Sequence, residues 1–595
     1  MIPHRTISLV AIVVFFAFLL LIFSSTPISD QSSSPVFGPA KYVPHPKLPS
    51  LSNIRFPFRP AAHRPPEQKN STSGESSWFS DWSWLNPFSS SITLDENRSV
   101  LPPLRERPPV YTYYDNNGQN DKDEQAADSK LLLAWRRAWF AQGFRPVVLS
   151  RGEAMNNQLY EAVQRLKLDP QLEAHFFSWL AWSHMGTGIL ADWRCFPMAK
   201  YDDELLSYLR RGAVPTHITR FENLDSGLFA GEKTRIDEAL KEAIKNANDH
   251  AKSITEIIPP DFFKVEQPSA LAFYDSATIT SHYPTLAEKH VDSSAAGRLA
   301  LTELINSHLH NTFQNTFVSG IAVLKPFPEH TTALVEPVLL LAKALIQCPP
   351  STLPTSCPPN RPKCVPCASA KAMPITQPSV FKNTSEIFTI GAIPHPYTLI
   401  SLLKGSDDIS TRYIRRETQR DQWLKEVTLD LLGTERGGPS RVVTFKEAVA
   451  GDAAVPRSLW MTVESLPAKA GEGLSPSLLD EMEWQFGFAI PRNTQAGEKK
   501  EKEKETRETK ETKDGKGAVG AKDGVDREYI LLDKAREVLR SKDTNRIGVR
   551  DVAEAWNLAD TEAWRFVRAY RARSVVERKK WEEEEKNFVG ARMEE

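Results

Sequence analysis

An acid and a base stand two positions apart, Asp192 and Arg194, in the apolar stretch WLAWSHMGTGILADWRCFPM (residues 179–198). Two carboxylates at that spacing, at the end of a strand, can hold Mn²⁺ or Mg²⁺ against the phosphate oxygens of a nucleoside diphosphate. Here the second position holds arginine, a cation that repels a divalent metal but can itself pair with phosphate oxygens. The residues therefore leave two interpretations open: a structural acid in a buried strand or the remains of a metal-binding site.

Other common catalytic motifs are missing from the sequence. It contains no G-x-S-x-G, H-E-x-x-H, P-loop or G-x-G-x-x-G pattern. Its 13 histidines are scattered, and His308 and His310 are two residues apart, which does not place them on one face of a helix. We expect these two histidines to be ordinary core or surface residues.

The segments before the opening stretch predict an α/β fold. VYTYY (110–114) and RPVVLS (145–150) are rich in strand-forming residues, and between them a helical pattern ends at Gly143. A strand, a helix and a second strand in this order begin a sheet flanked by helices. The segment 170–186 then leads into the stretch that carries Asp192.

Several small or polar residues near Asp192 have two interpretations each. Gly186 and Gly188 allow either close approach of the backbone to a ligand or close packing. Asp202 and Asp203 precede the helical segment DDELLSYLRRG, and we expect them to cap that helix rather than to replace a missing metal-binding acid.

The N-terminus predicts a membrane anchor. Residues 7–23 form an uncharged apolar run, whereas a secretory h-region has roughly 7–15 residues and a spanning helix needs about 17–20. We predict a transmembrane signal-anchor, with residues 1–6 as a cytoplasmic tail that carries Arg5. A cleaved signal peptide is the alternative, and either one places the rest of the chain in the lumen or outside. Residues 24–107, rich in Ser and Pro, predict a stem.

The rest of the chain divides into three predicted parts. Residues 108–492 carry the patterns of a folded domain, which include apolar helices within 295–347 and a strand in EIFTIGAI (386–393). Residues 493–525 form a charged linker with few apolar positions. Residues 526–595 predict a helical tail, either a small bundle or a coiled coil, that can recruit a protein partner.

Cysteine usage and charge limit the possible environments and partners. Four of the five cysteines lie close together, and in an oxidising lumen they predict two disulfides whose pairing the sequence leaves open. N-glycosylation sequons fit the same location. The net charge of −1 gives no support to nucleic acid as a partner. The cysteines are Cys348, Cys357, Cys364 and Cys367, and the sequons begin at Asn70, Asn97 and Asn383.

The order of these segments resembles glycosyltransferases of the family with a DXD-containing sugar-binding region. The string from Trp135 through Trp139 and Gly143 to Leu149, of the form W-x3-W-x3-G-F-x-P-V-V-L, carries the resemblance. It spans about residues 110–235 and is looser to about 490. It implies a GT-A fold, with a mixed sheet flanked by helices. It also implies a single-pass type II protein of the Golgi or endoplasmic reticulum membrane that transfers a sugar from a nucleotide-sugar to a lumenal glycan or glycoprotein.

The resemblance also implies site residues. It places the donor diphosphate at Asp192, Arg194, Gly186, Gly188, Asn223 and Asp225, and a metal at Asp192 and His395. Asn223 and Asp225 otherwise read as a plain polar turn. Arg194 departs from the family pattern, so either this arginine binds diphosphate without Mn²⁺ or Mg²⁺, or the domain is a non-catalytic binding or scaffold protein. No residue is assigned as catalytic base.

Overall fold

A computed structural model describes residues 60–66 and most of residues 101–588. Within the second range it leaves out residues 103, 116–120, 213, 215–216, 248–250, 290, 293, 325–334, 362, 379–380, 404–421, 435–437, 467–471 and 493–518. The predicted tail and anchor (1–23), most of the predicted stem, and the sequons at Asn70 and Asn97 therefore lie outside the described residues.

A mixed sheet of six strands carries the opening stretch. Its strands lie in the order β2-β1-β3-β6-β5-β7, and β6 is antiparallel to both of its neighbours, whereas the other pairs are parallel. The predicted α/β class, a mixed sheet flanked by helices, is confirmed at this level. The strands are β1 (Pro109–Tyr113), β2 (Arg145–Leu149), β3 (Gly188–Ala191), β5 (Ile218–Phe221), β6 (Leu228–Gly231) and β7 (Phe263–Glu266).

Helices cover both faces of this sheet because its strands alternate their apolar side chains. Val110 and Ile189 belong to the core that α2 (Lys122–Ala141) and α11 (Ala295–Thr316) complete. The neighbouring side chains Tyr111 and Leu190 face the opposite core, which contains residues of α5 (Pro170–Met185) and α7 (Lys233–Lys245). A sheet buried on both faces exposes only the ends of its strands, so ligands reach it at those ends.

Short elements connect and extend this layer. Strand β4 (Cys195–Pro197) follows Asp192 closely and pairs antiparallel with β8 (Leu271–Phe273). The predicted cap of DDELLSYLRRG is confirmed, because the Asp203 carboxylate accepts hydrogen bonds from the backbone N–H groups of Leu205 and Leu206 at the start of α6. The short helices are α3 (Arg151–Met155), α4 (Tyr160–Gln164), α6 (Glu204–Arg210), α8 (Ile254–Ile257), η5 (Pro260–Phe262), α9 (Ser276–His282) and α10 (Pro284–Ala287).

A second sheet of four parallel strands lies in the order β10-β9-β11-β12. Its core is continuous with that of the first sheet, because Val323 and Ile390 share one apolar cluster with Trp135. The strands are β9 (Ile321–Leu324), β10 (Ile375–Thr376), β11 (Phe388–Ile393) and β12 (Ser458–Thr462). The accompanying helices are α12 (Glu336–Ile346), η7 (Ser369–Lys371), α13 (Pro396–Leu403), α14 (Gln422–Leu432), α15 (Gly438–Ala450), η9 (Val463–Ser465) and α16 (Pro476–Phe486).

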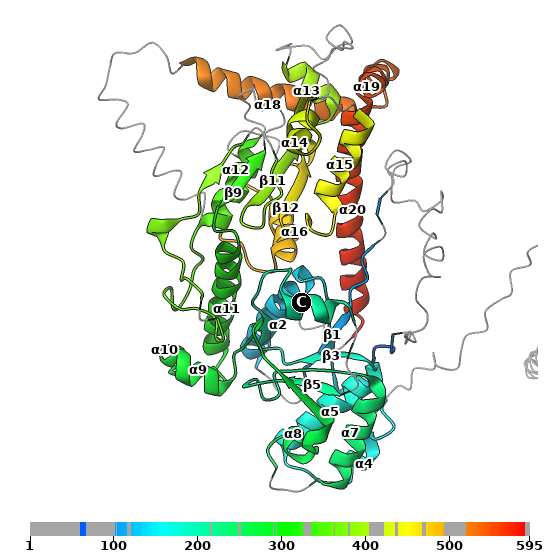
Figure 1. Ribbon diagram of the computed structural model, residues 1–595, viewed down its shortest axis with the longest axis vertical. Coiled ribbons are helices and arrows are strands. Elements are labelled where there is room, and N and C mark those ends of the chain that lie inside the picture. The colour runs from blue at the N-terminus through cyan, green and yellow to red at the C-terminus, as the bar shows by residue number, and fades with distance from the viewer. Residues whose placement is uncertain are drawn as a thin grey trace, which may run out of the picture. The chain divides into compact units, whose positions relative to one another are not determined.

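The C-terminal helices pack against this body. They are α18 (Val519–Arg540), α19 (Thr544–Trp556) and α20 (Leu558–Glu585). Helix α20 lies along α15 and β12 (Figure 1), and near its end Trp581 stacks on Phe140 of α2. The expectation of a coiled coil is therefore corrected, because α20 packs against α15 and β12 and, at Trp581, against α2, while α18 and α19 pack against α13. Helix α18 begins inside the predicted linker 493–525.

Residues 60–66 attach to this body through His63. Its Nδ1 lies 2.8 Å from Glu153 Oε1 and its Nε2 lies 3.0 Å from Glu585 Oε2 at the end of α20. Burial lowers the pKa of His63, but hydrogen bonds and charge from Glu153 and Glu585 outweigh this effect and raise it to about 9. A protonated His63 therefore joins the start of the described chain to its last helix.

Two disulfides are formed, as predicted, and they are nested. Cys348 pairs with Cys367, and Cys357 pairs with Cys364. Such bonds persist in oxidising compartments, which indicates a lumenal or extracellular environment. Cys195 is a free, buried thiol. Asn383, the one sequon within the described residues, is exposed.

The expectation of a transmembrane protein is corrected. Among the described residues, no helix combines the length and the apolar composition that a membrane crossing requires. The predicted helix at 7–23 falls outside those residues, so the structure gives the membrane anchor no support.

Candidate functional site

The carboxyl ends of β1, β2 and β3 meet at one edge of the six-stranded sheet because these strands are parallel. Asp115, Ser150 and Asp192 follow the three strands closely, so they lie along this edge. In open α/β sheets, ligands bind outside the carboxyl ends of the strands. We refer to this region as the Asp192 edge.

Asp192 shapes the turn that leaves β3. Its carboxylate Oδ1 accepts a hydrogen bond of 2.8 Å from the backbone N–H of Arg194, which is the Asx turn that aspartate forms readily. Its own N–H donates to the carbonyl oxygen of Gly227, at 2.9 Å, and so ties the turn to the start of β6. The side chain keeps 27% of its surface exposed. Burial raises the pKa of Asp192, while the charge and backbone N–H of Arg194 lower it.

The Arg194 guanidinium lies between two carboxylates. Its Nη1 is 2.7 Å from Asp292 Oδ1 and its Nε is 3.9 Å from Asp192 Oδ1. Asp292 also accepts a hydrogen bond from the hydroxyl of Ser276, so it draws together α9 and the segment before α11. The arginine therefore occupies the position that a divalent cation would take between these two acids.

A buried set of polar groups lies near this turn. Trp193 packs its edge against Tyr114, with ring centroids 5.4 Å apart. The Tyr114 hydroxyl donates to Asp128 Oδ2 at 2.6 Å, and Asp128 Oδ1 lies 2.8 Å from Nε of Arg298. Because Asp128 belongs to α2 and Arg298 to α11, this ion pair fixes the two helices against the end of β1. It supports the turn and holds no exposed group ready for a substrate.

Asp115 is a residue that the sequence analysis did not single out. It follows β1 at the same edge and accepts a hydrogen bond of 3.1 Å from the Tyr113 hydroxyl. Burial raises its pKa, and the Tyr113 hydrogen bond and the charge of Arg151 oppose that rise. Its position directly after a predicted strand could have identified it from the sequence as a residue at the ligand-binding edge of the sheet. Asp292 had no such signal, since it meets Arg194 only through the tertiary fold.

The two predicted glycines serve the local backbone and packing. Gly186 ends α5 with a φ of +98°, a region that favours glycine. Gly188 lies against Tyr111, since a Cβ at this position would come within 2.8 Å of the Tyr111 ring. Both glycines precede Asp192 in the chain, and they set the path of the backbone into β3.

Asn223 and Asp225 lie near the Asp192 edge. They occupy the connection between β5 and β6, with φ values of +58° and +40°, and both are exposed. Gly227 in the same connection accepts the hydrogen bond from the Asp192 N–H. The structure therefore brings these two predicted residues to the same edge, although no hydrogen bond joins their side chains to Asp192.

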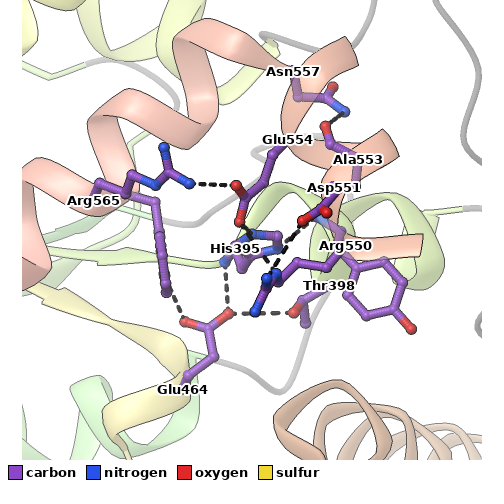
Figure 2. A network of polar contacts seen from close by, with 11 residues as sticks. His395, Thr398, Glu464, Arg550, Asp551, Ala553, Glu554, Asn557 and Arg565 are labelled. Atoms are coloured by element: carbon purple, nitrogen blue, oxygen red, sulfur yellow. Dashed lines mark hydrogen bonds and ion pairs between the residues drawn. The ribbon is translucent and has the colours of Figure 1, made fainter. Parts of the chain in front are cut away.

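His395 lies elsewhere, at the carboxyl end of β11 in the second sheet. Figure 2 shows its buried ring beside Glu464 and Glu554. Its backbone N–H donates to Glu464 Oε1 at 2.6 Å, and its Nε2 lies 3.4 Å from Glu554 Oε1. Trp564 of α20 packs edge-on against the ring. The structure therefore does not bring His395 together with Asp192, and its contacts are those of a residue that joins the second sheet to α19 and α20.

The residues at the Asp192 edge do not fit a divalent metal. Arg194 stands between the two nearest carboxylates, and its charge opposes a second cation there. In the part of the chain that the structure describes, no three His, Cys, Asp or Glu side chains gather in a metal-binding group. We therefore derive no chemical step through Mn²⁺ or Mg²⁺.

Comparison with known proteins gives one match. The family model described as a domain of unknown function (DUF8765) matches residues 72–595. No curated protein and no solved structure matches the chain.

Proposed function

This chain belongs to the DUF8765 family, and we propose that it is a glycosyltransferase that moves a sugar from a nucleotide-sugar to a glycan or glycoprotein. The donor diphosphate would bind at the Asp192 edge. One observation carries this proposal: the turn after β3 presents an acid and an arginine, both partly exposed, where α/β sheets bind ligands.

The arrangement around that turn supports a GT-A fold as part of the same proposal. The resemblance implies a mixed sheet with helices on its faces and an acid directly after one of its strands. The six-stranded sheet has one antiparallel strand, helices on both faces and Asp192 directly after β3. The connection that holds Asn223 and Asp225 would then face the bound sugar or its acceptor.

The chemistry rests on charge balance. Departure of a nucleoside diphosphate builds negative charge on its phosphate oxygens, and a positioned cation lowers the energy of that state. Arg194 carries five N–H donors, and only Nη1 lies within hydrogen-bonding distance of Asp292. Because Asp292 is 55% exposed, its ion pair contributes little, and phosphate oxygens can replace it at small cost. In this scheme Arg194 takes the role of the metal, and Asp192 holds its backbone and orients donor hydroxyls.

Calorimetry with a panel of nucleoside diphosphates, with and without Mn²⁺, tests the proposal. We expect one nucleotide to bind equally well in both conditions, and Arg194→Gln to weaken that binding about tenfold or more. Arg165→Gln is the matched control, because Arg165 is 79% exposed and pairs with Glu161 rather than with Asp192 or Asp292. If no nucleotide binds to the wild-type protein, the proposal is wrong.

A second candidate function is a non-catalytic binding or scaffold protein of the secretory pathway. The observation behind it is the contact of Arg194 with Asp292: if this ion pair stays closed when a nucleotide is present, no cation is left for the diphosphate. Nucleotide binding without donor hydrolysis or transfer would favour this candidate. Transfer to an acceptor glycan would favour the glycosyltransferase.

A further inference from the structure

A cavity of about 1090 Å³ lies at the opposite end of the parallel strands from Asp192. Its wall includes Arg105 and Arg107, which precede β1, and Arg145, the first residue of β2. Neither Asp192 nor Arg194 lines it. The cavity is therefore distinct from the proposed donor site, by about the length of a five-residue strand, or roughly 16 Å.

Four arginines from distant parts of the chain converge on this cavity. Arg105 and Arg107 come from the segment before β1, Arg210 from α6 and Arg573 from α20. Two tyrosines of the same wall lie among them: the Arg210 guanidinium lies 3.8 Å from the centroid of the Tyr201 ring, and Tyr570 lies near Arg105, Arg107 and Arg573. A set of cations gathered from three separate parts of the chain is unlike the scattered charge of an ordinary surface.

Arg107, Arg210 and Arg573 form no ion pair with any described carboxylate, although the charges of Asp202 and Asp203 act on Arg210 and that of Glu577 acts on Arg573. Arg107 donates to the carbonyl oxygens of Phe140 and Phe144, and Arg210 donates to those of Gln142 and Tyr201 and to the hydroxyl of Ser207. The bonds to Phe140 and Gln142 supply donors to carbonyl oxygens at the C-terminal end of α2, where the helix dipole favours cations. They use only some of the five donors of each guanidinium.

Arg573 and Arg105 leave further charge unbalanced. Arg573 donates from Nη1 to the carbonyl oxygen of Pro102 at 2.7 Å, and its Nε is buried without an acceptor. Arg105 pairs with Asp452, whose side chain is 96% exposed and therefore weakly held. Two hydroxyls, those of Tyr201 and Tyr570, also line the wall and make no hydrogen bond with any described residue. Carboxylates also line the wall, but among the described residues only Asp452 forms an ion pair with one of these four arginines, so most of their N–H donors do not face an acidic partner.

The electrostatics of the cavity fit this description. Partial shielding from water lowers the pKa of Arg107, although the residue stays exposed, and the neighbouring charge of Arg105 adds to the effect. Burial likewise lowers the pKa of Arg573 and of Arg210. An anion among these groups would relieve the repulsion and supply the missing acceptors.

We propose that these four arginines and two tyrosines form a binding site for a multivalent oxyanion, the phosphate or sulfate group of a ligand. Arginine and phosphate or sulfate oxygens form paired, charge-assisted hydrogen bonds. Farther along the wall, Phe140, Trp484 and Trp581 supply an aromatic surface for an apolar or planar part of the same ligand. The site is independent of sugar transfer and gives the protein a second ligand.

Titration with inorganic pyrophosphate at constant ionic strength tests this site. We expect saturable binding to the wild-type chain, and a loss of about tenfold or more in affinity in the double variant Arg105→Gln/Arg573→Gln. Arg165→Gln should leave the affinity unchanged. Parallel titrations with sulfate and with orthophosphate distinguish the two oxyanions as sources of the ligand group.

Arg194→Gln separates this site from the proposed donor site, which also binds phosphates. Pyrophosphate binding that survives in Arg194→Gln but disappears in the double variant supports the cavity. Binding that disappears in Arg194→Gln and survives in the double variant overturns the cavity and leaves the donor site intact. No saturable binding to the wild-type chain also overturns it.

A measurement on the wild-type chain covers the case in which the double variant does not fold. Phenylglyoxal modifies accessible arginines, and mass spectrometry locates the modified residues. We expect pyrophosphate to slow modification of Arg105, Arg107, Arg210 and Arg573 at least severalfold, with no change at Arg165. Equal rates with and without pyrophosphate at the four cavity arginines would contradict the proposal.

Discussion

The carboxyl ends of the two sheets differ in access. At the Asp192 edge, the side chain of Asp192 keeps 27% of its surface exposed and that of Arg194 keeps 24%. At the end of β11, His395 is fully buried and Glu554 of α19 and Trp564 of α20 cover it. Both edges belong to parallel strands and both carry charged groups. A strand end is a candidate site only where no later part of the chain has covered it.

The largest effect is expected at the covered edge. Glu464→Ala removes the acceptor for three donors, namely the backbone N–H of His395, the hydroxyl of Thr398 and the indole N–H of Trp564. Unsatisfied donors in a buried region are costly, so we expect the free energy of unfolding to fall by about 4 kcal/mol in chemical denaturation. Glu161→Ala, at a side chain that is 81% exposed, should change it by less than about 0.5 kcal/mol. A loss at Glu464 no larger than at Glu161 would show that the covered edge is not held by this network.

The attachment of α20 at its other end should depend on pH. The pKa of His63 is about 9 in the folded chain and 6.5 is its ordinary value, so folding favours the protonated form. The resulting stabilisation, about 3 kcal/mol, is fully present below pH 6.5 and is lost as the pH rises through 9. We expect the gap in unfolding free energy between wild type and His63→Gln to shrink over that interval. A difference in unfolding free energy that stays constant from pH 6 to 10 would contradict this. The control is His282→Gln, a change at an exposed histidine.

At the open edge, Arg194→Asp should create a metal site. The change removes the cation between Asp192 and Asp292 and adds a third carboxylate to this edge. We expect Mn²⁺ to raise the free energy of unfolding of this variant by about 1–3 kcal/mol at saturating concentration, and to leave wild type unchanged. Thermal denaturation with and without Mn²⁺ measures the difference. An equal response of wild type and variant would show that Arg194 does not keep metals out.

The smallest effect on stability is expected from an amide at the open edge. Asp192→Asn keeps an oxygen for the N–H of Arg194, so the free energy of unfolding should change by less than about 0.5 kcal/mol. Glu464→Gln, the matched change at the covered edge, turns one acceptor into a donor that faces other donors and should cost about 1–2 kcal/mol. Similar losses in both variants would mean that the two edges are equally structural.

The sequence predicted the local parts of the first sheet well. Strand patterns at 110–114 and 145–150 correspond to β1 and β2, and the helix pattern that ends at Gly143 corresponds to α2. These segments have strong periodicity or β-branched composition, and their partners are close in sequence. The cap at Asp203 was predictable for the same reason, because it involves neighbours only two and three residues away.

Long-range features were not predictable. The four-residue run at β9 has no period of its own, so it was not recognised between two helical patterns, and the second parallel sheet was missed with it. Asp292 meets Arg194 across 98 residues, and Glu554 meets His395 across 159. The disulfide pairing depended in the same way on the fold. Patterns along the chain identify elements, whereas contacts of this kind depend on how distant elements meet.

Helix α20 has a consequence for how the protein is made. It is translated after every element that it contacts, yet its side chains complete the surfaces of β12, α15 and α2. These surfaces therefore leave the ribosome before α20 is synthesised, and their apolar side chains stay exposed until α20 packs against them. A premature stop codon just before α20 would release a chain with both sheets present and a long apolar flank exposed, a substrate for quality control rather than a shortened working protein.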